Sequence, residues 1–99
     1  MISYFQENRK SFGIIRENKS TTLYFQAKYD IPEIEKFEIS CGCLKNLNFD
    51  KDTKIFSVRY NAGHVPNHLP LRQTIENTIT VIYKNKDTEI LTIVGIKTR

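Results

Sequence analysis

The sequence lacks long apolar runs. No apolar stretch among its 99 residues approaches the roughly 18 residues of a membrane-spanning helix, so we predict no contact with a membrane. The N-terminal residues 1–13 also lack a positively charged start followed by an apolar block, which excludes a recognisable secretion signal. We therefore expect the chain to stay where it is made.

A block of like charge is also missing. The 15 Lys and Arg residues are interspersed with 11 Asp and Glu residues, and the net charge is only +4. Nucleic-acid-binding proteins concentrate basic residues on one face, so we predict no nucleic-acid partner. The small basic spots at Arg9, Lys10, Lys97 and Arg99 are typical of a solvated surface.

Motifs for catalysis are missing as well. The sequence has no Gly-rich phosphate loop, no dinucleotide-binding fingerprint and no paired acid motif. Nucleophilic catalysis by Cys41 or Cys43 with a histidine would need an orienting group and an oxyanion site, and nothing in the sequence positions Asn61 or Asn67 for that task. We predict that the protein is not an enzyme and holds no cofactor.

What the sequence does contain is alternation. Apolar and polar residues alternate with a period of two, as in half-buried strands. The segments with this pattern are residues 11–16, 21–29, 33–41, 53–60, 72–84 and 88–97, and residues 2–6 form a short apolar start. Residues 46–52 and 61–71 are rich in polar residues or contain Gly63, Pro66 and Pro70, so we predict loops there.

This pattern predicts one all-β domain. Its length suits a single core, and 39% hydrophobic and 26% charged residues suit a soluble surface around it. Seven strands at about ten-residue spacing are typical of an immunoglobulin-like antiparallel β-sandwich, with a small closed barrel as the alternative. We assign residues 11–99 to the sandwich and residues 1–10 to an N-terminal arm or edge strand.

The Cys41-Gly42-Cys43 segment ends the third of these strands. A bridge across one residue closes a small, strained ring, and without a secretion signal we expect two free thiols buried at a strand end. Zinc binding by Cys41, Cys43, His64 and His68 is a weaker alternative, because the cysteine spacing is short and Pro66 forbids a regular helix between the histidines. A redox role is the third possibility.

Five segments in order resemble an immunoglobulin-like domain family of unknown function, found in bacteria and phages and marked by a Cys-Gly-Cys motif. The matching segments are residues 11–17, 21–29, 40–44, 56–60 with Gly63, and 91–96. The family is related to Hydin-type and major-sperm-protein-like domains. The resemblance implies a sandwich that binds proteins. Leu44 departs from the threonine that usually follows the second cysteine, and this chain lacks the secretion or lipid-attachment signal of many relatives.

Two apolar segments are candidates for contact with protein partners. The loop 61–71 carries His64, Val65, His68, Leu69 and Leu71, and the arm carries Ile2, Tyr4 and Phe5. Weak contacts of this kind add up when many copies assemble. We therefore expect an accessory (decoration) capsid subunit of a tailed-phage virion. The alternative is a cytoplasmic adaptor that adds a partner strand to a sheet edge.

Overall fold

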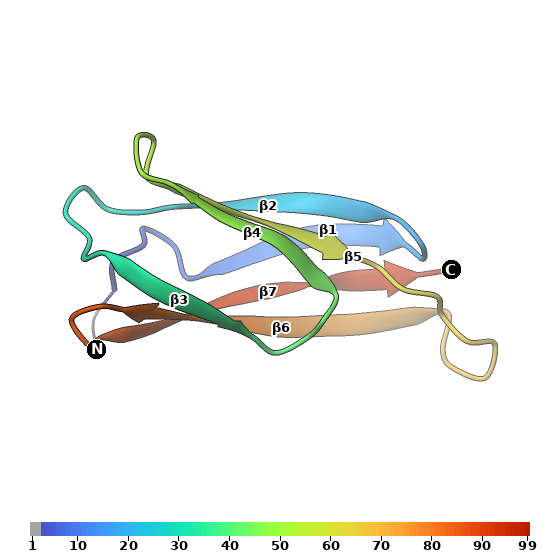
Figure 1. Cartoon of the computed structure of the whole chain (residues 1–99). Coiled ribbons are helices and arrows are strands. Elements are labelled where there is room, and N and C mark those ends of the chain that lie inside the picture. The colour runs from blue at the N-terminus through green and yellow to red at the C-terminus, as the bar shows by residue number, and fades with distance from the viewer. Residues whose placement is uncertain (1–2) are drawn as a thin grey trace.

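The computed structural model describes residues 3–99, which form two β-sheets that pack face to face (Figure 1). The seven strands are β1 (Arg9–Arg16), β2 (Ser20–Gln26), β3 (Ile34–Ile39), β4 (Leu44–Asp50), β5 (Ile55–Asn61), β6 (Arg72–Tyr83) and β7 (Thr88–Thr98). One sheet has the order β1-β7-β6-β3 and the other β2-β5-β4. No helix in the described chain is long and apolar enough to cross a membrane.

This strand order confirms the predicted sandwich of immunoglobulin type. Strands β2, β5 and β4 correspond to one sheet of a constant-type immunoglobulin domain, and β3, β6 and β7 to the other. The first strand differs, because β1 lies beside β7 and runs parallel to it. Within residues 3–99 the strand pairs are therefore antiparallel except for this one edge pair.

One strand corrects the sequence prediction. Residues 46–52 were expected to form a loop, but β4 extends from Leu44 to Asp50 and pairs with β5. A register shift between Lys45 and Asn48 hides its alternation, and Asn46 takes a left-handed backbone conformation there (φ 54°). This bulge lets Leu44 and Phe49 both face the other sheet although they have opposite parity.

The core lies between the sheets and follows the predicted alternation. Phe56, Val58 and Tyr60 of β5 are 0–2% exposed, as are Ile79, Val81 and Tyr83 of β6. Phe56 is central among the aromatic side chains: its ring lies 6.4 Å from Phe5, 6.2 Å from Phe25 and 4.6 Å from Phe37, measured between centroids.

The N-terminal arm packs on its own domain. Phe5 is 1% exposed in the core and forms an isolated bridge with Ala27 beside β2. The buried carboxylate of Glu89 accepts hydrogen bonds from the Tyr4 amide at 2.9 Å and from the Tyr83 hydroxyl at 2.9 Å. Burial raises the pKa of Tyr83, and the hydrogen bond to Glu89 raises it further, so this hydroxyl stays a donor.

One long side of the sandwich is closed by an aromatic stack. Phe12 of β1 stacks on Tyr60 of β5 with ring centroids 4.6 Å apart. A bulge at Gly13 (φ 76°) lets Phe12 and Ile15 both point toward the other sheet. On β7 the ring covers Gly95, where an added Cβ would overlap it. Two segments that are distant in sequence, 11–17 and 91–96, therefore meet at this contact.

This contact predicts that Gly95→Ala destabilises the protein. The new methyl group must displace the Phe12 ring from its stack, and overpacking of this kind costs about 1–3 kcal/mol in the free energy of unfolding. Gly63→Ala is the matched control, because open space surrounds that glycine, and we expect a change within ~0.5 kcal/mol. Urea unfolding followed by circular dichroism measures both. Equal stability of the two variants would contradict the close packing of the Phe12 ring on Gly95.

Candidate functional site

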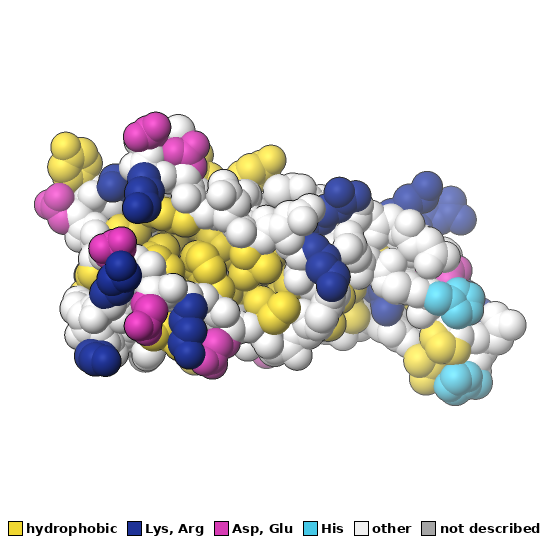
Figure 2. Space-filling view, viewed as in Figure 1, with side chains coloured by type: hydrophobic (Ala, Val, Ile, Leu, Met, Phe, Trp, Pro, Cys, Tyr) yellow, Lys and Arg dark blue, Asp and Glu magenta, His cyan; other side chains and the backbone are white. Residues whose placement is uncertain are grey.

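The opposite long side of the sandwich is open. There β3 is the outer strand of one sheet and β4 the outer strand of the other, and the two strands diverge (Figure 1). A cleft of about 560 Å³ lies at this side, and Figure 2 shows hydrophobic surface exposed along it. Its lining residues are Ile31, Pro32, Glu33, Ile34, Glu35, Lys36, Phe37, Phe49, Lys51 and Lys54. We call this cleft the β3–β4 groove.

Aromatic rings that belong to the core line the groove. Phe37 of β3 stacks on Phe56 with centroids 4.6 Å apart, and Phe49 of β4 meets Phe5 edge to face at 6.4 Å. Both Phe37 and Phe49 are only partly buried, so one side of each ring is packed and the other is accessible. The base of the groove is therefore part of the packed core, because moving either ring would open the core.

The free edge of β3 borders this groove. Ser40 donates its backbone amide to Thr78 at 3.0 Å, and Glu33 accepts the Lys84 amide at 2.9 Å. Hydrogen-bonded and non-hydrogen-bonded pairs alternate along an antiparallel ladder, so the Ser40 bond fixes the phase of the pairing with β6 from Lys36 onward, beyond the register shift between Ile34 and Lys36. In this part of β3 the amide and carbonyl groups of Phe37 and Ile39 therefore point away from β6. In the chain from residue 3 onward no strand pairs with this edge.

The charged side chains around β3 largely neutralise one another. Lys36 lies 3.6 Å from Glu38, and Lys84 lies 3.1 Å from Glu33, whose pKa it lowers. All four side chains are more than half exposed, so each pair contributes at most about 1 kcal/mol to stability. Charged side chains thus line the groove together with its aromatic rings.

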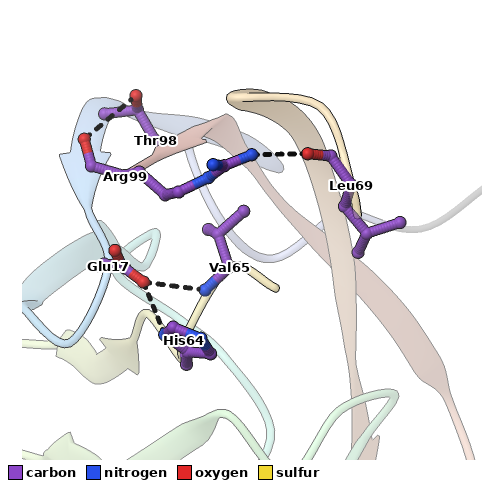
Figure 3. Close-up of polar contacts among 6 residues, drawn as sticks. All are labelled: Glu17, His64, Val65, Leu69, Thr98 and Arg99. Carbon is purple, nitrogen blue, oxygen red and sulfur yellow. Dashed lines mark hydrogen bonds and ion pairs between the residues drawn. The ribbon is translucent and has the colours of Figure 1, made fainter. Parts of the chain in front are cut away.

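The loop 61–71 is anchored to the domain by Glu17 and by Arg99. Val65 is fully buried, and the carboxylate of Glu17 accepts hydrogen bonds from the Val65 amide at 3.0 Å and from His64 Nδ1 at 2.7 Å (Figure 3). The Val65 amide, followed by His64, lowers the pKa of Glu17. Arg99 donates to the Leu69 carbonyl at 2.6 Å, so the C-terminus ties down the far part of the same loop.

The structure therefore separates the predicted contact residues into two groups. Phe5 and Val65 are buried in this domain, which corrects their assignment to a partner surface, and the Tyr4 ring packs against Tyr83 at 4.8 Å. Ile2 lies outside the described residues. His64, His68, Leu69 and Leu71 are exposed at one end of the molecule, where Figure 2 shows the two histidines beside hydrophobic side chains. These four stay predicted contact residues.

The two cysteines correct a further expectation. They are not free buried thiols: Cys41 and Cys43 form a disulfide, with Cα atoms 5.2 Å apart, and both residues are partly exposed. They lie in a tight turn after β3, closed by a hydrogen bond from the Leu44 amide to the Cys41 carbonyl at 3.2 Å, which brings the side chains together. Residues 3–99 contain no group of three or more His, Cys, Asp and Glu side chains placed to hold a metal ion.

Comparison with known proteins supports the fold. No family model matches the sequence, and no curated protein matches it. The crystal structure of a mutant SrpA adhesin from Streptococcus sanguinis has a similar fold, with a TM-score of 0.53 and 13% identity over 90% of this chain. The chain spans 56% of the adhesin chain. At this identity the likeness shows a shared β-sandwich and nothing about ligands.

The sandwich and the close pair Cys41–Cys43 agree with the resemblance to the Cys-Gly-Cys family, and membership of that family stays a prediction. Sequence reasoning missed the groove. Leu47 and Phe49, two apolar residues within an otherwise polar segment, were the signal that a strand was present.

The anchor at Glu17 predicts a pH-dependent loop. Its pKa is lowered in the folded protein, so the anchor is complete above the ordinary glutamate pKa of about 4.3 and is lost as the pH falls through the folded value. We expect the Val65 amide resonance to shift in that acidic range and to exchange faster with solvent. Glu17→Gln should remove this titration, whereas Glu35→Gln should leave it unchanged. An unaltered Val65 titration in Glu17→Gln would disprove the anchor.

Proposed function

We propose that this protein is a non-enzymatic interaction module that binds an extended segment of a partner protein in the β3–β4 groove. The observation that supports this function is the position of an unpaired strand edge directly beside a cleft that exposes the rings of Phe37 and Phe49. Such an edge presents amide and carbonyl groups at the spacing of another strand, so an extended segment is the ligand that satisfies them.

The geometry specifies what the segment should look like. Alternate side chains of an added strand point to opposite faces of the sheet. One set would enter the groove against Phe37 and Phe49, and the other would lie beside the charged side chains of Lys36 and Glu38. The ligand should therefore alternate aromatic or β-branched residues with polar residues over about five positions, the length of strand that β3 can pair with.

The same edge carries features that limit indiscriminate pairing. Natural edge strands avoid aggregation with charges and bulges. Strand β3 has both, with Lys36 and Glu38 on its outer face and a register shift between Ile34 and Lys36. A partner must thus supply side chains that fit the groove, since backbone pairing alone spans only the part of β3 beyond the bulge.

A role as an accessory capsid subunit is a second proposal. Leu69 is 37% exposed and Leu71 57% exposed, and both belong to the loop between β5 and β6, which lies at one end of the molecule (Figure 1). Two separate contact surfaces would let one copy touch two neighbours in a multi-copy assembly. The chain would then reside in a virion, whereas an adaptor with the same groove would reside in the cytoplasm.

Selection from a displayed library of random linear peptides tests the groove. We expect enriched peptides to show the alternating pattern and to protect the Phe37 and Ile39 amides from hydrogen exchange. Ile39→Pro removes an amide that points to the free edge and keeps the bonds to β6, so it should weaken peptide binding at least tenfold. Ile39→Ala loses a comparable side chain, keeps the amide and should bind within about threefold of the wild type.

Three results would overturn or redirect this proposal. Equal binding by the proline and alanine variants would exclude strand addition at β3. Peptides that shift the resonances of Leu69 and Leu71 would place the binding surface at the other end. Concentration-dependent dimers that protect the same two amides without any peptide would identify a second copy of the chain as the occupant.

A further inference from the structure

We propose that the Cys41–Cys43 disulfide is a thiol–disulfide exchange site for small thiols that carry a carboxylate. This site is separate from the β3–β4 groove, and its chemistry is independent of the proposed function. The bridge contributes little to the stability of the fold, because the chain-entropy stabilisation by a disulfide is smaller for shorter loops and only one residue separates these cysteines. Its place at the surface therefore needs a different explanation.

Both cysteines are accessible from one cleft. A cleft of about 530 Å³ lies where the turn after β3 meets β5, β6 and β7, and both cysteines line it together with Tyr60, Asn61, Gly63, Thr74, Ile75, Glu76, Asn77 and Lys97. An attacking thiol can therefore enter beside the bridge. Exposed disulfides are the labile and reactive ones, whereas structural disulfides resist reduction.

The side chains around the bridge are polar where the core pattern would place apolar groups. Along β6, Asn77 continues the series of Ile79, Val81 and Tyr83, and its amide donates to Cys43 Sγ at 3.4 Å. Cys41 Sγ instead accepts the Cys43 backbone amide at 3.1 Å. The Asn77 amide is thus positioned to stabilise negative charge that develops on the Cys43 sulfur.

Charge in the cleft favours an anionic thiol. Glu76 lies 3.5 Å from Arg9, which offsets its carboxylate. Lys97 forms no ion pair with any carboxylate of residues 3–99. A carboxylate on the incoming molecule would therefore meet a cation in the same cleft, and a cationic thiol would be repelled.

The exchange has two balanced steps. A thiolate attacks Cys41 Sγ, a mixed disulfide forms at Cys41, the Cys41–Cys43 bond breaks, and its electron pair goes to Cys43 as a thiolate next to Asn77. A second thiolate attacks the sulfur of the bound small thiol and releases Cys41. Two small thiols are oxidised to their disulfide, the bridge is reduced to two thiols, and the two protons pass from the small thiols to the cysteines.

Alkylation and intact-mass measurement of the full chain in glutathione buffers test this site. We expect millimolar glutathione to reduce the bridge while circular dichroism shows a folded protein, and peptide mapping after acid quench to find the mixed disulfide on Cys41. Asn77→Ala should slow reduction about fivefold, the worth of one hydrogen bond to the leaving sulfur. Asn61→Ala removes an amide from the same cleft and should keep the wild-type rate.

The choice of thiol tests the charge argument. Each rate is divided by the rate for the oxidised peptide of residues 40–44, which has the same cysteines without the cleft. This ratio should be larger for glutathione than for cysteamine, whose amine is positively charged. The proposal would be overturned if glutathione reduced the bridge of the wild-type protein only after the protein unfolds. This test does not depend on whether the Asn77 variant folds. Mixed disulfide on Cys43, or equal ratios for the two thiols, would also count against it.

Discussion

The burial of Phe56 is the interaction on which the rest of the structure depends. Its ring is fully buried on the middle strand of the smaller sheet, and it contacts the arm through Phe5, its own sheet through Phe25 and the opposite sheet through Phe37. Burying such a ring contributes about 1.5–3 kcal/mol through the hydrophobic effect alone. Phe56 therefore packs against both sheets, the docked arm and the base of the β3–β4 groove.

The groove follows from the unequal width of the two sheets. Neighbouring strands lie about 4.8 Å apart, so a sheet of three strands cannot cover a sheet of four. On the side of β1 the difference is made up by Phe12, which reaches Tyr60 across the gap and packs on Gly95. On the side of β3 no comparable ring closes the gap, and Phe37 and Phe49 stay partly exposed there. The side of the sandwich at β1 is thus closed by Phe12, and the groove remains open at the side of β3.

Much of this fold follows from the period of two in the sequence. The inward rows of β5 and β6 are the residues that the alternation selects, because each strand is regular and pairs on both sides. The alternation fails where the backbone departs from regular geometry. Asn46 at a positive φ shifts the parity of β4, and no local pattern could assign Leu44 and Phe49 to the same face. The groove could not be predicted from the sequence, because it lies between β3 and the β4–β5 segment, which belong to different sheets that only the fold brings together.

Whether an apolar segment is exposed or buried also depends on the fold. Phe5 and Val65 look alike in sequence to residues that contact partners, yet each lies beside a carboxylate that accepts the backbone amides of its segment, Glu89 for the arm and Glu17 for the loop. A buried backbone amide without an acceptor costs more than its neighbouring side chain gains at a loose contact. These two carboxylates therefore hold the arm and the loop against this domain. The backbone amides at the outer edge of β3 have no such acceptor within residues 3–99, and this difference is the basis on which we propose the groove as the binding surface.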